Sequence, residues 1–135
     1  MAIDVRVHRD PDYLLVVFSG IVSVADVDFL ISGMERGDFP PNFNLLHDFR
    51  AADAMVFPDQ TATGMSFRRR ETLKKNDRQV HAAVLGASDD IVEALRVWRA
   101  TFQADADFYV MRICDSEDMA MEWVGAQTAS SPAAQ

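Results

Sequence analysis

The order of the apolar runs constrains the fold of this chain more than any other feature. Two strand-like runs come first, at Ile3–His8 and Tyr13–Ser19, and helical and strand-like patterns then alternate to the end. Parallel neighbouring strands need a helix-length crossover, so this alternation predicts an α/β fold with a mixed, mostly parallel sheet. We expect one domain over residues 1–125, with about five strands in the order β-β-α-β-α-β-α-β-α, and a disordered tail over 126–135.

Periodicity and capping residues place the remaining elements. Strands are expected at 43–49, 79–86 and 108–114, and helices at about 24–36, 59–76, 88–102 and 116–125. The candidate caps of these helices are Ser23 with Asp26, then Asp59, then Ser88, then Asp115 or Ser116. The helix over 59–76 has only a thin apolar stripe, so we expect it at the rim of the domain. That stripe consists of Ala62, Met65, Arg69 and Leu73.

Composition limits the classes of partner and the compartment. The net charge of −8 argues against nucleic-acid binding, because phosphate contacts need a basic face. No apolar run approaches the ~20 residues of a membrane-spanning helix, so no membrane insertion is expected. Cys114 is the one cysteine and lies in a predicted strand, where a buried and unreactive thiol is expected. With no secretory signal pattern either, we expect a cytoplasmic protein.

Four segments carry a resemblance to a known family: LLHDFR at 45–50, HAAVLG at 81–86, FYVMR at 108–112 and EDMAMEWV at 117–124. Together with the order of elements, they resemble the STAS-like domains, the anti-sigma-factor-antagonist or SpoIIAA-like family, in its stand-alone single-domain branch. This resemblance implies a mixed sheet with helices mainly on one face, no enzymatic activity and no cofactor. A related lipid-carrier α/β fold shares the pattern.

The resemblance also implies a phosphorylated serine in the regulated members. That serine follows an aspartate at the start of the helix after the third strand, where a kinase-type partner docks. No Asp-Ser pair follows Asp48 in this chain, which departs from the family there. Thr61 is the nearest candidate phosphosite.

The three histidines give no metal site by spacing. His8, His47 and His81 all fall in predicted strands, and no His-x3-His pattern is present. His47 and His81 could lie close together if the third and fourth strands are neighbours. No nucleophile motif or phosphate-binding loop is recognisable, so no catalytic residue is assigned and no enzyme is expected.

Two polar residues at the end of the third strand form a second candidate site. Asp48 and Arg50 are two residues apart and therefore project to the same side of a strand. They either form a local ion pair or, together with Asp53, border a small polar pocket at the carboxyl edge of the sheet.

A third candidate site combines apolar and basic residues. The triplet Met55-Val56-Phe57 lies in an expected loop over 50–58, where it is either packed onto the sheet edge or exposed to a partner. Residues 68–78 contain six cationic side chains and two acidic ones. The loop and the helix 59–76 together predict a surface that binds another protein. Its residues are Met55, Val56, Phe57, Arg68, Arg69 and Arg70.

These observations favour a non-enzymatic, cytoplasmic protein-interaction or regulatory module with a STAS-like fold. The alternative is a domain that binds a small ligand or lipid in the space between the sheet edge and the loop 50–58. A third interpretation is a homo-oligomeric unit, such as a homodimer, that pairs through its exposed first strand.

Overall fold

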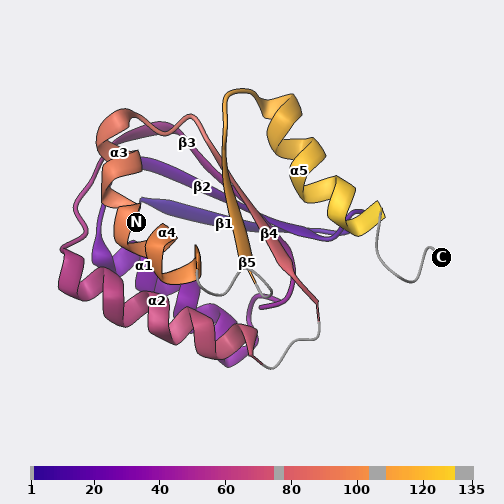
Figure 1. The fold of residues 1–135 in the computed structure, drawn as a ribbon, viewed down its shortest axis with the longest axis horizontal. Helices are drawn as coiled ribbons and strands as arrows, with labels where there is room; N and C mark the ends of the chain where they lie inside the picture. The colour runs from indigo at the N-terminus through magenta and orange to yellow at the C-terminus, as the bar shows by residue number, and fades with distance from the viewer. Residues whose placement is uncertain (1, 75–77, 104–108, 130–135) are drawn as a thin grey trace.

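A computed structural model describes residues 2–74, 78–103 and 109–129 of the chain. Its elements follow the predicted alternation (Figure 1). In chain order they are β1 (Ile3–His8), β2 (Tyr13–Val22), α1 (Val24–Arg36), β3 (Asn44–Met55), α2 (Asp59–Leu73), β4 (Val80–Leu85), α3 (Asp89–Ala94), α4 (Arg96–Gln103), β5 (Tyr109–Cys114) and α5 (Glu117–Ala129).

The five strands form one sheet in the order β1-β2-β3-β4-β5. β1 pairs with β2 in the antiparallel sense, and the other three pairs are parallel. The prediction of a mixed, mostly parallel sheet is therefore confirmed. β1 has only β2 as a neighbour and is an edge strand.

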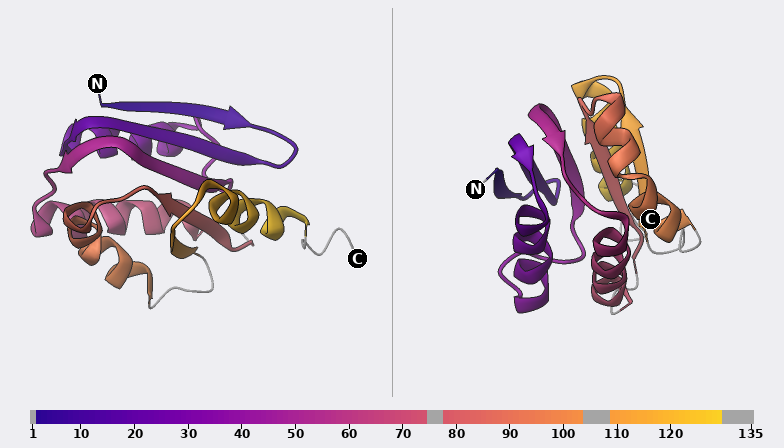
Figure 2. Two further views of the ribbon diagram at one scale, coloured as in Figure 1. Left: turned by 90° about the horizontal axis from the view of Figure 1, so that it is seen from above. Right: turned by 90° about the vertical axis from the view of Figure 1, so that its left-hand side faces the viewer.

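The helices divide unequally between the two faces of the sheet. Helices α1, α2, α3 and α4 cover one face and enclose the larger apolar core (Figures 1 and 2). α5 covers the other face, where Ala120 and Val124 pack on Leu46, Ala83 and Leu85. Successive residues of a strand point to opposite faces, so the fully buried run of β4 supplies both cores. The expectation of helices mainly on one face is confirmed.

α2 lies inside the helical layer, not at the rim as its thin apolar stripe suggests. It packs between α1 and α4, and its residues Ala62, Met65 and Leu73 belong to the larger core. Arg69, the fourth member of the stripe, is buried as well. The rim prediction is therefore wrong, because even a thin stripe is buried when two neighbouring helices cover its edges.

Several boundaries also differ from the prediction. β3 continues to Met55, which shortens the expected loop over 50–58, and α2 ends at Leu73. The helix expected near 88–102 is two helices, because the backbone bonds of α3 end at Leu95. α5 runs to Ala129 and so includes the start of the expected tail, whereas residues 130–135 lie outside the described part of the chain.

The caps follow the sequence signals with one exception. The Asp26 carboxylate accepts hydrogen bonds from the backbone N–H of Ser23 at 2.8 Å and of Ala2 at 3.0 Å, which joins the start of β1 to α1. Ser88 and Ser116 hydroxyls accept the N–H groups of Ile91 and Met119. Asp59 does not cap α2; it is the first helical residue and follows Pro58.

Asn44, at the start of β3, connects the sheet to α5. Its side chain is fully buried and donates to the Val124 carbonyl at 2.8 Å, and its amide oxygen accepts the His81 N–H at 2.9 Å. One side chain therefore provides hydrogen bonds to the backbone of both α5 and β4 at the same buried point.

We expect Asn44→Ala to lower the free energy of unfolding by about 1–3 kcal/mol, because the His81 N–H loses its acceptor and the Val124 carbonyl loses one hydrogen bond. Chemical denaturation measures this change. Asn42→Ala, two residues earlier and partly exposed, is the control and should change stability by less than about 0.5 kcal/mol. Equal effects of the two substitutions would contradict a bridging role for Asn44.

Candidate functional site

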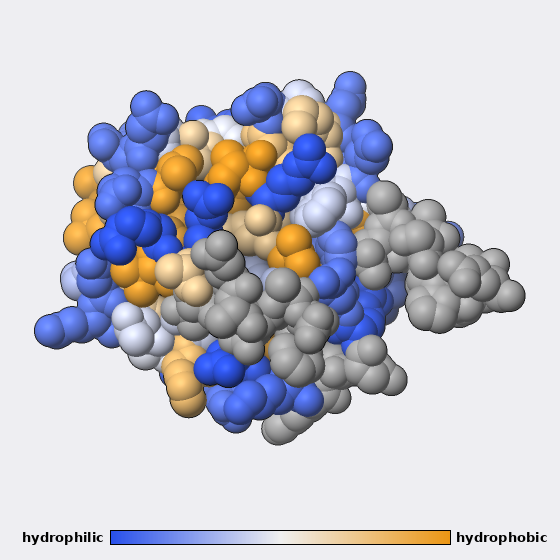
Figure 3. Space-filling model, in the orientation of Figure 1, coloured by the Kyte–Doolittle hydropathy of each residue, from blue (hydrophilic) through white to orange (hydrophobic). Residues whose placement is uncertain are grey.

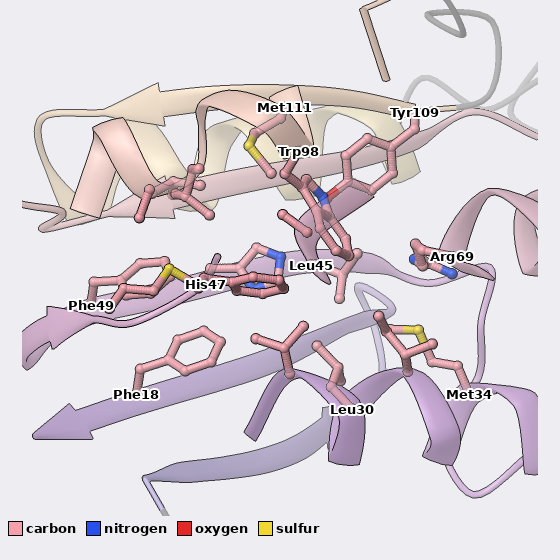
Figure 4. A pocket seen from close by; sticks show the side chains of 18 residues that line it. Phe18, Leu30, Met34, Leu45, His47, Phe49, Arg69, Trp98, Tyr109 and Met111 are labelled. Atoms are coloured by element: carbon pink, nitrogen blue, oxygen red, sulfur yellow. The ribbon is translucent and has the colours of Figure 1, made fainter. Parts of the chain in front are cut away.

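An apolar cavity lies between the sheet and the helical layer (Figure 4). Its volume is about 40 Å³, on a scale where one water molecule needs roughly 10–15 Å³. Strands β2 to β5 form its floor, and α1 to α4 form its roof. It is lined by Phe18, Val27, Leu30, Ile31, Met34, Leu45, His47, Phe49, Met55, Phe57, Ala62, Arg69, Val84, Ala94, Leu95, Trp98, Tyr109 and Met111.

The wall is almost entirely hydrocarbon, with few polar groups. In Figure 4, Arg69 and Phe49 lie at opposite ends of the cavity and His47 lies between them. Trp98 and Tyr109 share a side-chain hydrogen bond, and burial raises the pKa of the Tyr109 hydroxyl, which therefore stays neutral. Of the described residues that line the cavity, none is an aspartate or a glutamate.

Arg69 is a buried cation without an acidic partner among the residues that the structure describes. It is 2% exposed. Its Nη1 donates to the Pro41 carbonyl at 3.0 Å and to the Thr72 hydroxyl at 2.8 Å, and its Cζ lies 5.9 Å from the centre of the Tyr109 ring. Its Nη2 is buried and has no hydrogen-bond partner there. Burial lowers the pKa of the guanidinium to about 10, so it remains charged at neutral pH.

His47 is the second polar group of the cavity. Its ring lies beside the stacked pair of Phe18 and Phe49, with ring centres 6.0 and 6.4 Å away. Burial, reinforced by the charge of Arg69, lowers the pKa of the imidazole to about 4. The ring is therefore neutral at pH 7 and can both donate and accept a hydrogen bond.

The predicted protein-binding surface does not exist in the expected form. Phe57 is 9% exposed and packs edge-on against Trp98, while Met55 lines the cavity. Arg69 is buried as well, so the assignment of Phe57 and Arg69 to an exposed surface is wrong. Val56, 58% exposed, is the one member of the apolar triplet that faces solvent.

The neighbouring basic residues are also engaged within the chain. Arg68 forms ion pairs with Asp28 at 2.7 Å and with Glu35 at 2.6 Å, which join α2 to α1. Arg70 lies over the ring of Phe67. On the face drawn in Figure 3, hydrophilic side chains interrupt the exposed apolar ones. Binding of a protein partner by the remaining exposed residues stays a prediction.

Asp48 and Arg50 form the local ion pair that was one of the two expectations. Two guanidinium nitrogens of Arg50 bond the Asp48 carboxylate at 3.0 and 2.8 Å, and the Arg50 side chain holds the pKa of Asp48 below its usual value. Arg50 also reaches Glu117 of α5 at 3.4 Å. The pair therefore lies on the α5 side of the sheet, away from the cavity. Asp53 is exposed further along β3.

His47 and His81 are not brought together, contrary to the possibility raised by their strands. The register pairs Leu45 with Ala82 and His47 with Val84, so His81 has the opposite parity and faces α5. There its ring lies 4.6 Å from that of Trp123. Within the described ranges, no group of three or more potential ligands could hold a metal ion. Thr61 is partly exposed in the first turn of α2, and its phosphorylation stays a prediction.

Cys114 is buried, as expected for its place in a strand. Burial raises the pKa of its thiol, which keeps it in the unreactive protonated form. Over the described part of the chain, no helix is long and apolar enough to span a membrane.

Comparison with known proteins gives a likeness of fold. No protein-family model and no curated protein matches the chain. It is similar to the crystal structure of an uncharacterised protein from Shewanella loihica PV-4, which is described as a DUF3478 family member with a SpoIIAA-like fold. The two chains are 14% identical, the TM-score is 0.49, and the match covers 91% of this chain and 92% of the other.

Sequence reasoning missed the cavity, although one signal for it was present. Arg69 follows Met65 by four residues and precedes Leu73 by four, so it shares a helix face with two core residues. An arginine at that spacing indicates a buried cation. The cavity itself has no sequence signal, because it depends on how eighteen side chains from eight elements and their connections fit together.

We expect the neutral state of His47 to make stability depend on pH. Its folded-state pKa of about 4 lies below the usual histidine pKa of 6.5, so the unfolded chain binds more protons between these pH values. Stability must therefore fall as the pH drops from 6.5 towards 4. At pH 4.5 the loss from this group is about 2–3 kcal/mol.

His47→Phe removes the titrating group and should lose correspondingly less stability between pH 7 and pH 4.5. Urea denaturation at the two pH values measures the difference. Phe18→Leu changes the same cavity but retains His47, so it should keep the wild-type pH dependence. An unchanged pH dependence in His47→Phe would show that this imidazole is not held neutral.

Proposed function

We propose that this protein binds a small, largely apolar molecule in the cavity under its helical layer, without chemical conversion. The observation that carries this proposal is the cavity itself, with its largely hydrocarbon wall and the side chains of Arg69 and His47. This is the ligand-binding alternative of the sequence interpretation, which named the space beside the segment 50–58; Met55 and Phe57 of that segment line the cavity.

A cavity in a natural core is unfavourable unless something occupies it. Protein interiors are packed about as densely as organic crystals, and unfilled volume lowers stability. Apolar cavities hold water poorly and take up apolar molecules instead. Persistence of such a space beside a buried cation supports a role in binding.

The walls allow occupants somewhat larger than the space seen here. Met34, Met55 and Met111 contribute to the lining. Methionine side chains are unbranched and flexible, so they adapt to ligands of different shape. The lining contains no serine, cysteine or carboxylate side chain, which favours binding over catalysis.

The protein-interaction interpretation ranks second. It loses its central aromatic anchor, because Phe57 packs against Trp98, and it loses Arg69 to the interior. Hot spots at protein interfaces are built on such aromatic and arginine residues. The large apolar side chains that remain exposed near this segment are Val56 and Phe67, and the neighbouring Arg68 is already paired with Asp28 and Glu35.

Filling the cavity should abolish binding without unfolding the protein. Ala94, at the end of α3, lines the cavity and is partly exposed, so Ala94→Leu can extend into the space. Hexanol and toluene are the neutral probes, and backbone amide NMR shifts follow their binding. We expect saturable shifts at Leu45, Val84 and Met111 in the wild type and at least a tenfold weaker effect in Ala94→Leu.

Ala100→Leu is the matched control, since it adds the same atoms at an exposed position of α4. It should bind the probes as the wild type does. Native mass spectrometry of the purified protein also searches for a ligand that copurifies. If neither probe shifts the cavity residues of the wild type, the proposed function is wrong.

A further inference from the structure

The cavity contains an uncompensated positive charge. The contacts of the Arg69 guanidinium are a backbone carbonyl, a hydroxyl and the face of an aromatic ring, all of them neutral. No carboxylate lines the cavity, and Nη2 has no hydrogen-bond partner among the described residues. Buried charges in proteins are normally paired, because removal from water is costly. No described residue supplies the anion that such a site requires.

We infer that the ligand carries a single carboxylate group, which pairs with Arg69 while the rest of the ligand fills the apolar part of the cavity. This inference rests on the proposed function and deepens it. In Figure 4 the Arg69 side chain lies at one end of the cavity, with the apolar lining extending from there to Phe49. A molecule with one charged end and one apolar end matches that distribution.

Two features favour a carboxylate over a phosphate. A guanidinium binds either anion through parallel N–H groups. The cavity supplies one cation, however, and its other polar group, His47, is neutral at pH 7. A dianionic phosphate would leave negative charge unpaired in a hydrocarbon wall, whereas a monocarboxylate is neutralised by Arg69 alone.

The volume indicates a compact ligand. A space of about 40 Å³ accepts a group of a few heavy atoms before the methionine side chains must move. Short aliphatic acids and benzoate are therefore the appropriate class of probe, and long acyl chains are not. The neutral isosteres of these acids provide a comparison in which only the charge changes.

The experiment compares butyrate, hexanoate and benzoate with butanol, hexanol and benzyl alcohol on the wild type. Isothermal titration calorimetry or backbone amide shifts give the dissociation constants at pH 7. We expect each acid to bind at least tenfold more tightly than its alcohol. In Arg69→Met, the ratio of the dissociation constant of each alcohol to that of its acid should fall to about one or below, while the alcohols still bind.

Lys74→Met is the matched control, because it removes one exposed positive charge at the end of the same helix. It should keep the wild-type preference for the acids. Thermal denaturation without ligand adds an independent measurement. Arg69→Met should melt no lower than the wild type, since a buried cation with an unmade hydrogen bond is replaced by an apolar side chain of similar length.

The outcomes separate this inference from the proposed function. Alcohols that bind the wild type as tightly as the acids would overturn the carboxylate assignment and leave the cavity as an apolar site. An acid preference that survives in Arg69→Met would also overturn it. If neither acids nor alcohols bind, both proposals fail. If Arg69→Met does not fold, the comparison of acids with alcohols on the wild type and on Arg69→Lys still tests the carboxylate assignment. Lysine keeps the positive charge but presents no bidentate pair of N–H donors.

Discussion

The inward position of the Arg69 guanidinium determines how the helical layer of this protein packs. Arg69 shares the inner face of α2 with Ala62, Met65 and Leu73, and its Nη1 donates to the Pro41 carbonyl and to the Thr72 hydroxyl of the same helix. On the outer side of α2, the ion pairs of Arg68 join this helix to α1. Consecutive arginines therefore lie on opposite sides of α2, and the inner one lines one end of the cavity.

The two faces of the sheet have different physical characters. On the α5 side, small residues such as Ala83 and Ala120 allow close packing, and Asn44 and Trp123 donate hydrogen bonds to backbone carbonyls across the layer. On the opposite side, large aromatic and methionine side chains surround a space. β3 supplies both faces by alternation, so His47 lines the cavity while its neighbour Asp48 pairs with Arg50 beneath α5.

The sequence predicted the fold better than the site, for a physical reason. The order of strands and helices along the chain and the helix caps at Ser23 and Ser88 depend on local patterns that a reader can recognise. The orientation of Arg69 and Phe57 depends on competition between burial and solvation across several elements. Charge and loop position suggested exposure for both, and packing against Tyr109 and Trp98 decided otherwise.

The unfavourable features of this core all meet at one place. A buried guanidinium with an unmade hydrogen bond and an unfilled volume each lower the stability of the free protein. A domain is stabilised by only about 5–15 kcal/mol in total, so two such features at unrelated points would be hard to sustain. Because Arg69 itself lines the cavity, the proposed ligand would relieve both features at once, with an anionic group for the guanidinium and apolar atoms for the empty volume.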